Sequence, residues 1–399
     1  MPNKIQTGLE ILLNNPKLLS NPGNKVAYLG HEASVNHKLE PGYMAINQLI
    51  GKRLDRLFGP QHGFASLDQD NMIETNHQIH PSLGIPVYSL YSETRKPSPE
   101  MLEGLDTLII DLQDVGTRVY TYIWTLYLIM ESCIGKDIRI MVLDRPNPID
   151  GLTIEGNLPQ AEWYSFVCMG QIPMRHGLTF GEMALLFNKE FNNQVNLEVI
   201  PMTGWKRNMH WDDTGLTWVN PSPNLPTYSG SLVFPGTVLI EGTELSEGRG
   251  TTRSLELIGH PELDPYRLGP VLNKELEKAG LSGFALRPTF FKPTFQKHMN
   301  KVCGGFQVHS TYRDEFEPWK LMQNIFRVLY HELKLEKFWH TNPYEYETKG
   351  LAIDFINGSP AIRKWIESNG SSEELTELEN GGHKEFKEKR EEILLYTTK

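Results

Sequence analysis

The chain has 399 residues, more than one typical domain holds, so we expect two domains. Its formal net charge of −10 argues against nucleic acid as the main partner, because phosphate binding requires a basic surface. The three cysteines, Cys133, Cys168 and Cys303, are too widely spaced for a disulfide framework, so we expect free thiols. No signal peptide opens the sequence and no apolar run reaches the roughly 18 residues of a membrane helix. As written, the sequence predicts a cytoplasmic protein without a membrane span; a chain trimmed of its leader would be periplasmic or extracellular.

Short apolar strands alternate with helical segments through the first 150 residues. We expect helices at 7–14, 44–49, 99–104 and 120–131, and strands at 25–29, 53–58, 86–90, 108–110 and 138–143. This alternation predicts βαβ units around a parallel sheet, with the carboxyl ends of all the strands at one edge. The sequence has no GxGxxG, so the dinucleotide fingerprint is absent. A doubly wound α/β sheet is the fold that this pattern favours.

Loops dominate the next hundred residues. One helix is predicted at 179–191, where Thr179 can cap and Glu182 completes a capping box, and a strand is predicted at 197–201. Further on, we expect helices at 268–278, 319–333 and 360–368, a strand at 306–311, and a broken terminal helix over 373–396. The long loops hold too many aromatic residues for disorder, so we expect them to be functional.

Polar turns follow four of the predicted strands, and a parallel sheet brings them to one edge. The turns are Gly30-His31-Glu32, Gln61-His62, the segment from Asp111 to Arg118, and the segment from Asp144 to Asn147. Asp111 and Asp114 are either turn and cap residues or an acid/base pair with separated pKa values. His62 and His176 each precede a glycine; a lone histidine is more often structural, but we expect at least one of the two to be functional. No ligand-spaced Cys/His cluster occurs, so a metal site is not expected.

Three loop features add candidates. The stretch 241–252 supplies Glu241, Glu244, Glu247 and Arg249 among glycines, and it is either an ordered binding loop or a solvated acidic loop. The stiff segment PSPNLP at 221–226 would hold Asn224 at a fixed angle, unless it is a plain rigid linker. Tyr120 could stack on a sugar ring, although an aromatic side chain is more often packing.

The chain resembles the exo-β-N-acetylmuramidase NamZ family in six segments. These are GPQHGF, DLQDVGTRVYTYIWT, VLDRPNPIDGLTIEGN, IPMRHGLTFGEMA, WVNPSPNLPT and FPGTVLIEGTELSEGRGTT, in an order that covers about residues 8–355. The resemblance implies a Rossmann-like α/β domain, which we set at residues 1–160, and a smaller α+β domain at 161–399, with the active site in the cleft between them. It also implies a bacterial glycoside hydrolase of cell-wall recycling without an organic cofactor. The expected substrate is a muropeptide or disaccharide that loses its terminal N-acetylmuramic acid from the non-reducing end.

Glycoside hydrolysis generally requires two carboxyls beside the scissile bond. We expect Asp114 and Glu247 in this role, with Asp111 as a further candidate and with His62 and His176 near the bond. N-acetylmuramic acid carries a lactyl carboxylate, for which Arg118, Arg175 and Arg249 are the candidate partners. The remaining expected substrate contacts are Gln61, Tyr120, Asn147, Glu155, Asn224 and Glu241.

One position departs from the family pattern, in which the turn after the second strand reads Pro-Glu-His-Gly. Here it reads Pro60-Gln61-His62-Gly63, and an amide does not titrate. The acid role therefore lies elsewhere in the chain, or the specificity has changed, or the chain is a non-catalytic binding protein for muropeptides or acidic sugars. A Rossmann-type enzyme acting on another acidic sugar or small acid is the remaining alternative.

Overall fold

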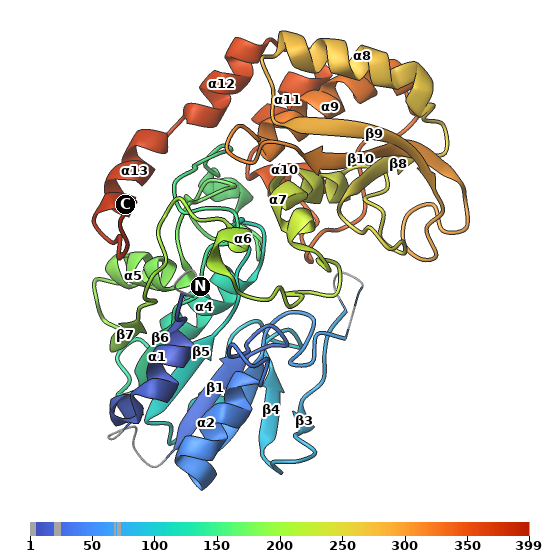
Figure 1. Ribbon diagram of the computed structural model, residues 1–399. Helices are drawn as coiled ribbons and strands as arrows, with labels where there is room; N and C mark the ends of the chain where they lie inside the picture. The colour runs from blue at the N-terminus through green and yellow to red at the C-terminus, as the bar shows by residue number, and fades with distance from the viewer. Residues whose placement is uncertain (1–4, 20–24, 68, 70–72, 399) are drawn as a thin grey trace.

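A seven-stranded sheet organises the N-terminal half of the computed structural model, which describes residues 5–19, 25–67, 69 and 73–398 (Figure 1). The strand order is β3-β4-β2-β1-β5-β6-β7, and every neighbouring pair is parallel except β3 with β4. The strands are β1 (Val26–Gly30), β2 (Leu54–Gly59), β3 (Gln78–Ile79), β4 (Pro86–Ser89), β5 (Thr107–Asp111), β6 (Arg139–Leu143) and β7 (Leu197–Ile200). Strands β1 and β5 are buried along their whole length, as their continuous apolar runs require.

Helices cover both faces of this sheet, so the doubly wound α/β fold is confirmed. Alternate residues of each strand point to opposite faces. Val26 and Tyr28 of β1 pack with helices α1 (Gly8–Asn14) and α2 (Gly42–Ile50). Ala27 and Leu29 join the larger core. That core also holds side chains of α3 (Pro99–Leu102), α4 (Tyr122–Ser132) and α5 (Phe180–Glu190).

The C-terminal half is built on a three-stranded antiparallel sheet, in the order β8-β10-β9. Helices pack against it, and a final pair of helices returns along the N-terminal half (Figure 1). The elements are α6 (Trp211–Thr214), α7 (Tyr228–Thr237), β8 (Leu257–His260), α8 (Pro265–Lys278), β9 (Phe284–Phe291), β10 (Cys303–Ser310), α9 (Pro318–Leu333), α10 (Ala352–Asn357), α11 (Ala361–Glu367), α12 (Ser372–Asn380) and α13 (His383–Glu391). Single 3-10 turns lie at Pro16–Leu19 (η1), Gly51–Arg53 (η2), Ala161–Trp163 (η3) and Val238–Gly242 (η4).

The parallel sheet extends beyond residue 160, where we expected the first domain to end. Strand β7 pairs with β6, and the helix α5 before it packs on α4, so both belong to the N-terminal half. Helix α7, in contrast, packs on α9 and β10. The expected boundary followed the onset of long loops, but those loops connect elements of the large sheet. We therefore propose a boundary between β7 and α7.

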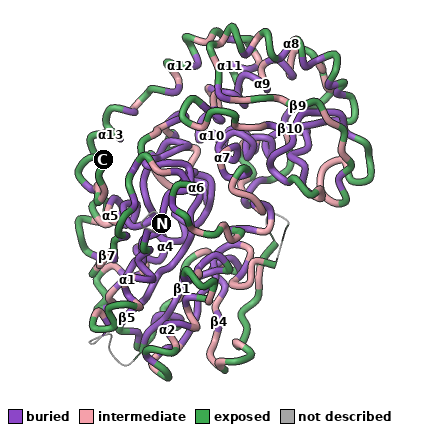
Figure 2. The backbone as a smooth tube through the Cα atoms, viewed as in Figure 1, coloured by how far each residue is buried: buried purple, intermediate pink, exposed green. Residues whose placement is uncertain are grey.

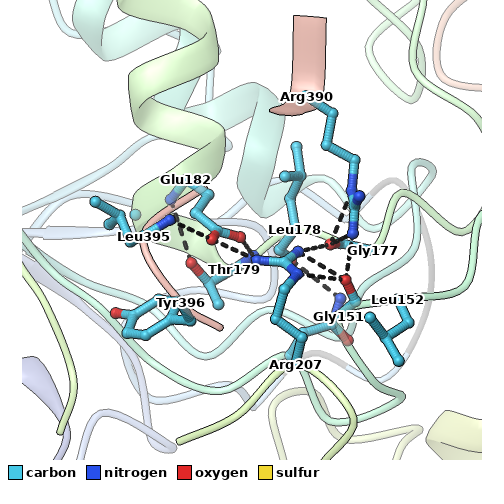
Figure 3. A network of polar contacts seen from close by, with 12 residues as sticks. Gly151, Leu152, Gly177, Leu178, Thr179, Glu182, Arg207, Arg390, Leu395 and Tyr396 are labelled. Atoms are coloured by element: carbon cyan, nitrogen blue, oxygen red, sulfur yellow. Dashed lines mark hydrogen bonds and ion pairs between the residues drawn. The ribbon is translucent and has the colours of Figure 1, made fainter. Parts of the chain in front are cut away.

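The C-terminal segment is fastened to the N-terminal half by a buried polar network (Figure 3). Arg390 of α13 and Arg207 both donate hydrogen bonds to the carbonyl oxygens of Gly151 and Gly177. Arg207 also pairs with Glu182, whose carboxylate accepts from the backbone of Thr179 in the predicted capping box. Because Arg390 bonds to the same two carbonyl oxygens as Arg207, the terminus helps to hold the loops at Gly151 and Gly177.

The extent of burial differs between the large sheet and the C-terminal helices. In Figure 2 the strands of the large sheet and the region of α4 are mostly buried, whereas α12 and α13 expose much of their length. Cys133, Cys168 and Cys303 are buried free thiols. Over the described part of the chain, no helix has both the length and the apolar character needed to cross a membrane.

Candidate functional site

A small pocket lies at the junction of the two halves. It encloses about 50 Å³, room for only a few water molecules. The turn after β2, the start of α4 and the 222–224 segment line it from the N-terminal side, and α7, η4, the loop around 249–255 and the loop around 344–345 line it from the other side. The lining residues are Gln61, His62, Val119, Tyr120, Thr121, Tyr122, Val167, Ser222, Asn224, Phe234, Val238, Glu241, Arg249, Leu255, Tyr344 and Glu345.

Arg249 connects two carboxylates on the C-terminal side of the pocket. Its guanidinium contacts Glu241 and lies 3.2 Å from an oxygen of Glu247. Lys297 lies 3.2 Å from the other oxygen of Glu247. Burial alone would raise the pKa of Glu247, but the charges of Lys297 and Arg249 hold it below its ordinary value. Glu247 is therefore an ionised, fully paired carboxylate behind the pocket, whereas Glu241 lines it.

Glu345 is the second carboxyl of the lining, and its surroundings differ. The hydroxyl of Tyr91 donates a hydrogen bond of 2.8 Å to Glu345 Oε2. Burial raises the pKa of Glu345 to about 7, and the neighbouring Glu241 adds to the rise, while the Tyr91 hydrogen bond, the charge of Arg95 and a hydrogen bond with Gln61 oppose it. A buried carboxyl with a raised pKa is a candidate for acid/base chemistry.

A tight turn presents Glu345 to the pocket. Tyr344 and Glu347 pair through their backbones, and the two residues between them, Glu345 and Tyr346, have φ of 47° and 69°. Positive φ at both central positions normally calls for glycine or asparagine. Backbone strain of this kind is frequent at functional sites, where surrounding contacts hold it in place. Here, Arg95 stacks on the ring of Tyr346, with 4.9 Å from its Cζ to the ring centroid.

Gln61 faces this turn from the end of β2. Its side chain is only 7% exposed, and its Oε1 accepts a hydrogen bond of 2.6 Å from the Thr121 hydroxyl. Because the amide oxygen bonds to Thr121, just before α4, the amide nitrogen is the group that donates toward Glu345. The next residue, His62, has φ of 70°.

The structure brings six of the fourteen predicted site residues to the pocket. They are Gln61, His62, Tyr120, Asn224, Glu241 and Arg249. Eight others do not line it: Asp111, Asp114, Arg118, Asn147, Glu155, Arg175, His176 and Glu247. The roles expected for Asp111, Asp114, Arg118 and Asn147 rested on turns converging at one sheet edge, but these four side chains are buried in contacts with other chain segments.

The acids at the end of β5 illustrate these contacts. Asp111 is fully buried and makes an ion pair with Arg145, with a further hydrogen bond of 2.6 Å from Tyr28. Asp114 accepts from the backbone of Gly116 and lies 3.6 Å from His176 Nε2. Both acids therefore make structural contacts and do not line the pocket.

Three further predicted residues join chain segments. Arg118 is fully buried and donates to the carbonyl oxygens of residues 157, 172 and 356, and burial lowers its pKa. Arg175 bonds to Asp150 at 2.9 Å and lies 3.7 Å from Glu155. Asn147 donates to the carbonyl oxygen of Leu178. Among the three candidate arginines, Arg249 is the one that reaches the pocket.

Sequence reasoning missed the loop that carries Glu345. The run Asn342-Pro343-Tyr344-Glu345-Tyr346-Glu347 combines a proline with alternating aromatic and acidic residues between two helices. This composition marks an ordered polar loop and is the signal that could have found it. Across the described residues, no group of three or more His, Cys, Asp or Glu side chains is arranged to hold a metal ion.

A doubly wound domain joined to a smaller domain, with a carboxyl-lined pocket at their junction, is the architecture of an enzyme for a small polar substrate. The chain belongs to the exo-β-N-acetylmuramidase NamZ family, because the N-terminal domain pattern of that family matches residues 26–229 and its C-terminal pattern matches residues 232–396. The predicted family and the glycoside-hydrolase class that its name denotes are confirmed. The two matched ranges meet within the first turn of α7.

Known proteins agree with this assignment. The chain is 41% identical to the peptidoglycan β-N-acetylmuramidase NamZ of Bacillus subtilis over 98% of its own length and 92% of that protein. Two crystal structures of DUF1343 family proteins from Bacteroides fragilis superpose with TM-scores of 0.85 and 0.76, at 29% and 27% identity. The first match covers 99% of both chains and the second covers 100% of both.

Proposed function

We propose that this chain removes the terminal N-acetylmuramic acid from the non-reducing end of peptidoglycan fragments, and that the pocket between its halves is where the glycosidic bond is cleaved. The observation that supports this assignment is the pair of pocket carboxyls, Glu241 and Glu345, in unlike surroundings. Cleavage of a glycosidic bond generally requires two carboxyls with different tasks.

The rest of the lining suits the sugar. Arg249 can offer its guanidinium to the lactyl carboxylate, which distinguishes N-acetylmuramic acid from N-acetylglucosamine. Tyr120 supplies an aromatic surface next to Asn224, which supplies an amide for a ring hydroxyl. A small pocket favours the end of a glycan over the interior of a strand, which is what exo-action requires.

A small volume means that the substrate displaces part of the lining. The loop with Glu345 reaches the N-terminal half through Tyr91 and Arg95, and these contacts close one side of the pocket. Movement of this loop would open the site, and its return would bring Glu345 to the bound sugar and exclude water.

The proposal is tested with purified protein and three substrates: the disaccharide in which N-acetylmuramic acid is β-linked to N-acetylglucosamine, and the 4-nitrophenyl β-glycosides of each sugar. We expect release of N-acetylmuramic acid from the disaccharide and from its aryl glycoside, and little release from the glucosaminide. Tight binding of the disaccharide in calorimetry, with no sugar released after long incubation, would overturn the proposal in favour of the non-catalytic alternative. The comparisons give that alternative no support, since the Bacillus relative carries the name of an enzyme.

A further inference from the structure

We propose that Glu345 is the residue that protonates the glycosidic oxygen, and that Gln61 is a positioning residue whose amide holds the Glu345 carboxyl in the pocket. This inference rests on the proposed function and names the chemistry of the same site. It also gives a physical reason for an amide at position 61, where the family pattern has a glutamate.

The two pocket carboxyls differ in the charge of their partners. Glu241 is paired with the permanently charged Arg249 and accepts a hydrogen bond of 2.8 Å from Tyr344. Glu345 accepts from the neutral hydroxyl of Tyr91 and is hydrogen-bonded to the neutral amide of Gln61. A buried carboxyl among neutral donors retains its proton more readily than one beside a guanidinium. Glu345 is therefore the proton carrier of the site.

The orientation of Gln61 decides what it does. Its oxygen accepts from Thr121, so its nitrogen is directed to Glu345. A glutamate in its place would bring a third carboxyl next to Glu345 and Glu241, and one of the three would have to hold a proton at neutral pH. The amide avoids this competition, so the titratable proton of the site resides on Glu345.

The proposed step conserves protons and electrons. The Glu345 carboxyl transfers its proton to the glycosidic oxygen while the bond from that oxygen to the anomeric carbon breaks, and the electron pair of the bond stays with the leaving sugar. Water supplies the oxygen that the anomeric carbon finally carries, and one proton of that water returns to Glu345 by the end of the cycle. No oxidant, reductant or metal ion enters the balance.

Several charged or titratable groups lie around Glu345. They are Tyr91 and Arg95 from the segment after β4, Tyr344 and Tyr346 from its own turn, Glu241 from η4, Arg249 on the same side of the pocket, and His62 on the opposite side. Because the proton donor must be protonated, we expect kcat/KM to fall as the pH rises through about 7.

The first test compares wild type with Glu345→Gln on substrates of different leaving-group ability. Loss of a proton donor slows cleavage of the natural disaccharide by about 10² to 10⁴-fold, whereas a 2,4-dinitrophenyl muramide, whose leaving group needs little protonation, is slowed far less. The variant should also lose the fall of kcat/KM near neutral pH. Glu347→Gln, in the same turn, is the matched control and should keep the wild-type rates and pH profile.

The second test is Gln61→Glu, which adds a carboxyl without removing Glu345. We expect the alkaline fall of kcat/KM to move to higher pH, because another negative charge makes Glu345 harder to ionise. If Gln61→Glu instead leaves the alkaline fall at the wild-type pH, the side chain at position 61 does not act on the titrating carboxyl and the positioning role of Gln61 is overturned.

Cleavage rates on the disaccharide and on the dinitrophenyl substrate distinguish a wrong role for Glu345 from a wrong function for the protein. Wild type that cleaves muramides, together with a Glu345→Gln variant slowed equally on the disaccharide and on the dinitrophenyl substrate, overturns the role of Glu345 and leaves the function standing. Wild type that cleaves no muramide overturns both.

Discussion

Glu155 provides a stability prediction that is independent of catalysis. It is 2% exposed, its Oε1 accepts from the backbone of Lys320, and Arg175 lies 3.7 Å away. Burial outweighs Arg175 and raises the pKa of Glu155 from 4.5 to about 8. At about 1.4 kcal/mol per pH unit, this rise corresponds to a penalty of about 5 kcal/mol for the ionised form in the folded chain.

The sign of the effect follows from linkage. A carboxyl whose folded pKa is raised contributes stability that is fully present below about pH 4.5 and is lost as the pH rises through about 8. A Glu155→Gln variant keeps an acceptor for the Lys320 amide but cannot ionise. We therefore expect it to match wild type within about 1 kcal/mol at pH 5 and to be the more stable protein at pH 9, by up to about 5 kcal/mol.

Urea unfolding followed by tryptophan fluorescence at pH 5, 7 and 9 measures this difference. The exposed Glu162, changed to Gln in the same way, is the control and should show no pH-dependent difference from wild type. A gap between wild type and Glu155→Gln that stays constant from pH 5 to pH 9 would refute the assignment of a buried, proton-retaining carboxyl at this position.

Three further predictions concern the pocket and its supports. Arg249→Met should raise KM for the aryl muramide by at least about 10-fold and leave the weak binding of the aryl glucosaminide little changed, because only the muramide offers a carboxylate to the guanidinium; steady-state kinetics on the muramide and calorimetry with the glucosaminide measure this. Arg95→Met removes three ring contacts, of which the one with Tyr346 holds the 341–349 loop and is worth about 0.5–1 kcal/mol, so limited proteolysis should cut this loop about 2- to 5-fold faster. Tyr396→Phe removes a hydroxyl that bonds to Asp144, and urea unfolding should show a loss of about 1–3 kcal/mol.

Much of the architecture could be predicted because it depends on local patterns. The buried strands β1, β5 and β6 are continuous apolar runs, and α5 opens with a capping box, so both kinds of element carry their own signal. Strand β9 does not: it contains Pro288, and its residues are exposed or half-buried. Helix α7 contains Pro235 and two glycines, and it is stabilised by packing on α9 rather than by propensity.

The site was only partly predictable, for a physical reason. The rule that polar turns meet at the edge of a parallel sheet predicted that Gln61 and His62 would lie at the site, and both line the pocket. The same rule does not identify the acids that pair with structural partners. Asp111 is taken by Arg145, and this pairing depends on a contact between two strand ends that no spacing reveals. It also says nothing of Glu345, which arrives from a loop more than 200 residues further along the chain.

Gln61, the position that departed from the family pattern, is explained by its contact with the 344–347 turn. Considered alone, Gln61 looks like the loss of an acid, and it motivated the hypothesis of a protein that binds without turnover. In the folded chain its amide bridges Thr121 of α4 and Glu345 of the 344–347 turn, so it connects the N-terminal half to a carboxyl that the C-terminal half supplies. The pocket still contains a titratable group, Glu345, which the C-terminal half supplies. That side of the pocket is a loop that contacts Tyr91 and Arg95 of the N-terminal half. If Glu345 is the proton donor that we propose, we expect protonation of the substrate to depend on the position of this loop, whereas an acid on the turn after β2 would not depend on it.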